Sequence, residues 1–226
     1  MASSIEVNLD MSGPANPSIS LDGGATYSTS LLCNSTIGTD DVITTGYQMK
    51  LWGDVDESEN VNIQTAEEDS EWISFSTSQQ IKWSAGDGTK TINLRLRDDV
   101  LNESTVATDT IILDTTSPII TITGGPTPAK ISKVTGKRVT TFSFRSDEGF
   151  EAYEVMVVAN AGDGHASGTL IGVVNGSVNM SGSAGGYAAD TDIECTLDGA
   201  DLETAGAEGV NVIKVFVQDE AGNWSI

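Results

Sequence analysis

The sequence contains two unequal copies of one pattern, and this internal repeat limits the possible folds more than any other feature. Residues 16–24 read NPSISLDGG and residues 117–125 read SPIITITGG, which keeps the proline, the alternating apolar residues and both glycines at an offset of 101. A second match joins residues 88–104 to residues 209–225 at an offset of 121. There, alternating apolar residues lead into DDVLNES in the first copy and DEAGNWS in the second. Each copy opens and closes in the same way, which predicts two domains of one fold.

The two matches also predict the domain boundaries. We expect an N-terminal arm at residues 1–15, a first domain at residues 16–116 and a second domain at residues 117–226. The link between the copies, DTTSP, is short and polar, and its proline favours an extended start to the next strand. Since the offset grows from 101 to 121, the second copy carries about 20 additional residues by subtraction. We expect them around residues 161–190, which are rich in Gly, Ser and Ala.

Both copies consist of short alternating apolar runs separated by turn residues, a pattern typical of an all-β sandwich. Thr, Ser, Gly, Val and Ile dominate, and segments with a helical period of 3.6 residues are hard to find. In the first copy we expect strands at residues 18–21, 28–33, 45–52, 72–75, 80–83, 91–97 and 108–114. In the second copy we expect strands at residues 119–123, 138–145, 151–160, 169–174, 193–197 and 211–219.

The charge of the chain argues against two classes of partner. Its 33 acidic and 11 basic residues give a formal charge of -22, which repels nucleic acids and anionic membrane surfaces. No apolar run approaches the roughly 20 residues that span a bilayer, and the N-terminus has no secretory signal pattern. The two cysteines, Cys33 and Cys195, fall in different copies, so we expect both to be small buried apolar side chains without a disulfide.

Several segments resemble a known family of domains. Residues 86–99 read GDGTKTINLRLRDD, and residues 109–118 read DTIILDTTSP. They resemble the closing half of bacterial and bacteriophage Ig-like repeats, which read G-D-G-x-K-x-[VI]-x-[VL]-x-[VFL]-x-D-x-x-G-N before a last strand that ends D-T-x-x-P. LWGDVD at residues 51–56 and EWISF at residues 71–75 resemble the phage branch of that family. Leu101 stands where the family often has glycine, which would allow a differently shaped turn.

The resemblance implies two tandem immunoglobulin-like β-sandwich domains with an N-terminal extended arm. Such domains occur in tailed-phage virions, and this predicts a non-enzymatic capsid decoration or tail accessory protein that assembles in the host cytoplasm. The expected partners are other virion proteins and further copies of the chain, without nucleic acid or membrane insertion. A bacterial surface adhesin or a carbohydrate-binding accessory module is the alternative. An enzyme ranks third, because no acid, base and nucleophile converge in the sequence.

Two groups of acidic residues are candidate sites. Asp98 with Asn102, and Asp219 with Asn223, follow the penultimate strand of each copy, where short polar side chains commonly bond the backbone of a turn. The densest acidic stretch offers a candidate calcium site; its residues are Asp54, Asp56, Glu57 and Glu59. A solvated loop is the other interpretation, because the EF-hand spacing is absent. Apart from calcium, we expect no cofactor.

The histidine and the tryptophans are weaker candidates for functional sites. His165, the only histidine, lies in a glycine-rich segment without a recognisable nucleophile motif, which argues against catalysis. The tryptophans could stack on sugars, but in sandwich strands they more often fill cores or line interfaces. They are Trp52, Trp72, Trp83 and Trp224.

The second copy ends one strand early. The first copy continues past Ser104 into a last strand, whereas the sequence stops at Ile226, directly after the equivalent Ser225. A missing strand leaves unpaired backbone groups at a sheet edge. Residues 5–10 alternate like a strand and have no counterpart before the second copy. We therefore expect binding by strand addition, and the candidate residues are Ile5, Val7, Leu9, Trp224 and Ile226.

Overall fold

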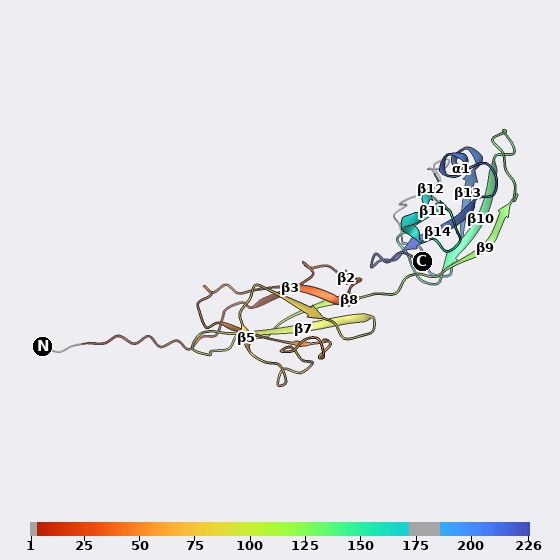
Figure 1. Cartoon of the computed structure of the whole chain (residues 1–226). Helices are drawn as coiled ribbons and strands as arrows, with labels where there is room; N and C mark the ends of the chain where they lie inside the picture. Colours follow the sequence, from red (N-terminus) through yellow and green to blue (C-terminus); the bar gives the residue numbers. More distant parts are fainter. Residues whose placement is uncertain (1–3, 172–185) are drawn as a thin grey trace. The chain divides into compact units, whose positions relative to one another are not determined.

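The computed structural model describes residues 4–171 and 186–226. The chain divides into two compact units, Met1–Thr115 and Thr116–Ile226, each rich in strands (Figure 1). Residues 172–174 of the strand expected at 169–174 lie outside the described residues, as does the middle of the segment 161–190.

The first domain contains two sheets. One has the order β1-β3-β6 and consists of β1 (Ser18–Leu21), β3 (Leu32–Gly38) and β6 (Ser78–Lys82). The other has the order β2-β8-β7-β4-β5 and consists of β2 (Tyr27–Ser28), β8 (Ala107–Leu113), β7 (Gly88–Arg97), β4 (Gln48–Gly53) and β5 (Ile73–Ser74).

Period-two alternation builds the core of this domain. Ile92, Leu94 and Leu96 of β7 are fully buried, and the residues between them face outward. Cys33 of β3 and Leu51 of β4 are buried in the same cluster, so both sheets contribute to one core. Each such side chain stabilises the fold by about 1.5–3 kcal/mol relative to its exposed state.

The second domain also has two sheets, with the orders β13-β10-β9 and β12-β11-β14. Their strands are β9 (Ile120–Thr127), β10 (Val139–Ser146), β11 (Ala152–Val158), β12 (Thr169–Leu170), β13 (Ile193–Asp198) and β14 (Val212–Gln218). A 3-10 turn (His165–Ser167) and the helix α1 (Gly199–Ala205) complete it. Phe144 and Phe150 of its core cluster pack near Tyr153.

The strand orders correspond between the domains. The pair β9 and β10 repeats β1 and β3, while β11, β13 and β14 take the places of β4, β6 and β7. In each domain, two sheets of mainly antiparallel strands around one core form an immunoglobulin-like β-sandwich, so the fold is all-β, as the sequence predicts. Among the described residues of the second domain, no strand takes the place of β8.

Two predicted features need correction. The strand expected at residues 28–33 is split between β2 and β3, because the Ser28 and Ser30 hydroxyls bond the backbone of residues 30–32 and turn the chain. The additional residues of the second copy are not confined to 161–190. The connection from β13 to β14 also spans residues 199–211 and contains α1, whereas residues 83–87 suffice between β6 and β7.

An acidic residue ends β13 and begins α1. Asp198, whose side chain is only 3% exposed, accepts hydrogen bonds from Arg138 Nε at 2.6 Å and from the Ala200 N–H at 2.9 Å. The Arg138 bond, acting against the cost of burial, lowers the pKa of Asp198. A depressed carboxyl pKa contributes stability above the unfolded value of about 3.9, and this stability is lost as the pH falls through the folded pKa.

Arg138→Gln is therefore expected to move acid unfolding of the second domain to a higher pH, because Asp198 would keep its proton more readily. Circular dichroism during acid titration measures the midpoint. Lys133→Gln is the control, since it removes the exposed Lys133–Glu203 pair instead. Equal midpoints for Arg138→Gln and the unaltered chain would contradict this role of the pair.

Both cysteines are buried, as the sequence predicts. Cys33 and Cys195 are free and fully buried, one in each domain. Burial raises the pKa of each thiol to about 12. In the described part of the chain, no helix is long and apolar enough to cross a membrane.

Candidate protein interface

In the part of the chain that the structure describes, one edge of β14 has no partner strand. β14 pairs with β11 along one side. On the other side, the Val217 N–H donates to Ser225 Oγ at 3.1 Å, and the Val217 carbonyl accepts from the Ser225 N–H at 2.9 Å. Since backbone groups alternate along a strand, those of Ile213 and Val215 point to this same side. No strand within residues 4–171 and 186–226 pairs with them there.

The first domain shows how such an edge is filled. Leu96 and Ser104 form the same pair of bonds as Val217 and Ser225. From there the chain continues into β8, which pairs Ala107 with Leu94 and runs antiparallel along β7. The edge of β14 is thus the place that β8 occupies in the other copy.

An apolar groove accompanies the open edge. It lies between β9 and β14 of the second domain, and its apolar lining includes Pro118, Ile120, Ile122, Ile213, Val215 and Ile226. Ile122 is 55% exposed and Ile226 is 92% exposed. In the first domain, the buried Ile111 and Leu113 of β8 belong to the core. The groove therefore offers apolar surface that a strand could bury.

The N-terminal arm is exposed along its apolar face. Ile5, Val7 and Leu9 are 89%, 84% and 79% exposed, and residues 4–14 form no strand or helix. The arm leaves the first sandwich as an extended trace (Figure 1). It is tied to that domain from Asp10 onward, where the Asp10 carbonyl accepts a bond from Asn102 Nδ2 at 3.3 Å. The arm before Asp10 is thus available to a partner.

Trp224, a candidate residue for partner binding, already has contacts within its own domain. It pairs with Gln218 at the end of β14, and its ring stacks on His165 with centroids 3.8 Å apart. His165 Nε2 lies 2.6 Å from Glu154 Oε2, and the His165 ring also meets the edge of Phe216. Trp224 therefore belongs to the packing of its own domain, because a stack and a backbone pair already hold it.

The two acidic turns match the sequence-based expectation. Asp98 Oδ1 accepts from the N–H groups of Val100 and Asn102, and Asp98 Oδ2 accepts from Asn102 Nδ2. Asp219 Oδ1 accepts from the N–H groups of Gly222 and Asn223, and Asp219 Oδ2 accepts from Asn223 Nδ2, so the bonds from the asparagine are the ones that both turns share. Burial opposes ionisation of Asp98, but the bonds from Asn102 and the turn backbone outweigh it and lower its pKa.

Leu101 does not alter the turn, contrary to the expectation of a different shape. It adopts a φ of 70°, and the equivalent Gly222 adopts 101°. In both turns the N–H of this residue donates to the carbonyl of the aspartate. The hydrogen bonds of Asp98 impose the turn, so leucine takes a left-handed conformation that costs roughly 1–2 kcal/mol.

Leu101→Gly is expected to stabilise the first domain by about 1 kcal/mol, because glycine tolerates this φ and the leucine side chain is mostly exposed. Urea unfolding measures the gain. Gly222→Ala, the reverse change in the second domain, should destabilise by a similar amount. A loss of stability on Leu101→Gly would show that the turn is not strained.

The acidic stretch does not form a calcium site in this structure. Asp54 accepts from the Thr91 N–H, and Glu57 from Thr65. Lys82 approaches both Asp56 and Glu59, at 3.7 and 3.3 Å. Asp56 and Glu59 thus share Lys82, whereas Asp54 and Glu57 bond other residues, and the four carboxylates do not form one cluster. These residues belong to a loop that is held by hydrogen bonds and ion pairs. Lys82, which is distant in sequence, lies next to two of its carboxylates.

The tryptophans do not share one surface. Trp83 lies in the core of the first domain. Trp72 is covered by Arg97 and Lys50, whose charged groups lie 4.3 and 5.1 Å from its ring centroid. Trp224 is held by His165 in the second domain. The half-buried Trp52 alone does not make a sugar platform.

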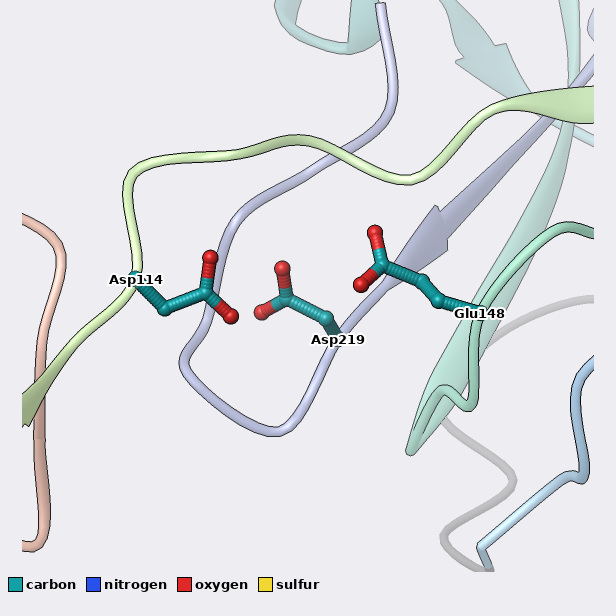
Figure 2. Close-up of side chains that lie close together, drawn as sticks. All are labelled: Asp114, Glu148 and Asp219. Atoms are coloured by element: carbon teal, nitrogen blue, oxygen red, sulfur yellow. The ribbon is translucent and has the colours of Figure 1, made fainter. Parts of the chain in front are cut away.

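Another pair of carboxylates lies at the base of β14. Figure 2 shows the side chains of Glu148 and Asp219, both of the second domain, close to each other. The figure also labels Asp114, which follows β8 in the first domain. Asp219 already accepts three bonds from its own turn. Since Ca²⁺ takes six to eight oxygen ligands, two carboxylates alone do not make a calcium site.

Comparison with known proteins yields structural similarity alone. No protein-family model and no curated protein matches the sequence. Fibronectin(III)-like modules of CbhA from Clostridium thermocellum are 12% identical, with a TM-score of 0.41, and the match covers 92% of this chain and 89% of that chain. A chitinase from Bacillus thuringiensis is 12% identical, with a TM-score of 0.31, over 92% of this chain.

Beta-glucuronidase 3 of Bacteroides uniformis is 7% identical, with a TM-score of 0.24, over 93% of this chain. This chain spans only 30% of the chitinase and 24% of the glucuronidase. The immunoglobulin-like assignment therefore rests on the strand order and the two cores of this chain.

Proposed function

We propose that the chain is a non-enzymatic structural protein that joins a larger assembly through contacts of its immunoglobulin-like domains. The observation that carries this proposal is the edge of β14 away from β11, where no strand among the described residues pairs with Ile213 and Val215 and an apolar groove lies alongside. An exposed edge of this kind pairs readily with a strand from another chain. Main-chain bonds would supply affinity, and the groove would select the side chains.

The assembly proposed is the virion of a tailed bacteriophage, with the chain as a capsid decoration or a tail accessory protein. The support is the resemblance of residues 86–99 and 109–118 to Ig-like repeats, together with the phage-like segments at 51–56 and 71–75. Other virion proteins would be the partners, and assembly would take place in the host cytoplasm.

Locating the chain tests this proposal. Phage particles assembled with the chain are purified, and cryo-electron microscopy is used to find density for two linked sandwiches on the capsid or tail. Particles that never contain the chain would contradict a virion role. Recovery of the chain on a bacterial surface, with binding to a glycan array, would favour the adhesin or carbohydrate-binding alternative.

A single substitution tests the use of the edge. Ile213→Pro removes the N–H that faces the open side, and since no described residue pairs with that group, the fold should persist. We expect this variant to remain folded but to lose incorporation into particles by roughly tenfold or more. Ile213→Ala, which keeps the N–H, is the control. Normal incorporation of folded Ile213→Pro would show that the edge is not used.

A further inference from the structure

We propose that the strand added to β14 is the arm, residues 4–10, of a second copy of this chain. This inference rests on the proposed use of the β14 edge, and it names the occupant. The arm holds three exposed apolar residues, Ile5, Val7 and Leu9, at the two-residue spacing of a strand.

Equivalence with β8 fixes the direction and register. β8 runs antiparallel to β7 and places Ala107 opposite Leu94, whose counterpart in the second domain is Val215. An arm in the same register places Ile5 opposite Val215 and Val7 opposite Ile213. These pairs use the backbone groups that face the open side. Because opposite residues point to the same face of a sheet, the three apolar side chains enter the groove beside β9.

The outward face of this register pairs opposite charges. Glu6 falls opposite Lys214, the only basic residue of β14. In the first domain the equivalent outward pair is Thr108 with Asn93, joined by a hydrogen bond of 2.8 Å. Lys214 Nζ already donates to the Asp163 carbonyl at 2.7 Å, so Glu6 would meet a lysine whose position its own domain holds. Shifting the arm by one residue would turn Ile5, Val7 and Leu9 away from the groove.

A disulfide trap tests the register between copies. Chains with Glu6→Cys are mixed with chains that carry Lys214→Cys, so only an intermolecular disulfide can join them. Cys33 and Cys195 do not interfere, because burial raises the pKa of both thiols to about 12. We expect covalent dimers under mild oxidation. The control pairs Glu6→Cys with Val210→Cys, a fully exposed position four residues from Lys214 and therefore out of reach of residue 6 in this register.

Matched arm substitutions test the apolar face. Val7→Asp adds a negative charge to the face that enters the groove, and Asn8→Asp adds the same charge on the opposite face. We expect Val7→Asp to weaken self-association of the full chain roughly tenfold or more and Asn8→Asp to weaken it less than about threefold, measured by sedimentation velocity.

Equal trapping of Lys214→Cys and Val210→Cys, or equal association of the two arm variants, would overturn the inference. A different result would contradict the proposed function. Suppose that folded Ile213→Pro fails to enter particles while the disulfide trap forms no dimer. In that case the edge of β14 binds a strand other than the arm, and only the inference about the arm is contradicted. If Ile213→Pro assembles normally, the use of the edge itself is wrong.

Discussion

Replacing Phe144 by alanine is expected to destabilise the second domain by about 4 kcal/mol. Phe144 is fully buried, and its ring lies 5.3 Å from that of Tyr153 and 6.2 Å from that of Phe150. Alanine removes these contacts and leaves a cavity that the flanking strands cannot close. Urea unfolding, followed by NMR signals of β11, measures the loss.

The first domain offers the matched substitution. Trp83 is fully buried in the other core, so Trp83→Ala should cost about 4 kcal/mol in the first domain. Trp83 Nε1 has no hydrogen-bond partner, so Trp83→Phe should cost far less. A loss below about 1 kcal/mol for Phe144→Ala would mean that this ring is not a central part of the second core.

Replacing Asp98 by alanine is expected to cost the first domain about 3 kcal/mol. The carboxylate is buried and accepts three hydrogen bonds that hold the turn after β7. Its lowered pKa means that this stability is present above a pH of about 3.9 and is lost as the pH falls through the folded pKa. Denaturant unfolding at pH 7 and in an acid series measures both effects.

The repeat supplies an internal comparison for this turn. Asp219→Ala should affect the second domain in a similar way, since Asp219 also accepts three bonds from its turn, two of them from Asn223. Asp99→Ala is the control, because Asp99 is exposed and bonds only Thr44 at 3.3 Å. If Asp98→Ala costs no more than Asp99→Ala, the carboxylate does not hold the turn.

Strands with strict alternation could be predicted from the sequence, and features set by side-chain capping could not. Ile92, Leu94 and Leu96 mark β7 because every second residue faces the core. The break between β2 and β3 depends on serine hydroxyls that compete with the ladder. Helix α1 was not predicted, although Asp198 stands at its N-cap as a signal that could have revealed it.

The candidate interface was partly predictable for the same reason. The repeat aligns Ser225 with Ser104, the residue that precedes the last strand of the first copy, and alternation marks Ile5, Val7 and Leu9 in the arm. The role of Trp224 was not predictable, since its stack on His165 joins residues far apart in sequence. The calcium hypothesis stays a prediction, and the four carboxylates do not form one cluster, because closeness in sequence does not by itself bring side chains together across a loop.

Hydrogen exchange at β14 tests most directly the claim that the second sandwich has an open, usable edge. In the dilute chain, the amides of Ile213 and Val215 should exchange at least tenfold faster than those of Ile92 and Leu94, which face β8 in the first domain. In the assembled state, the two β14 amides should become protected. Strong protection of Ile213 and Val215 in the dilute monomer, unchanged on assembly, would contradict the account.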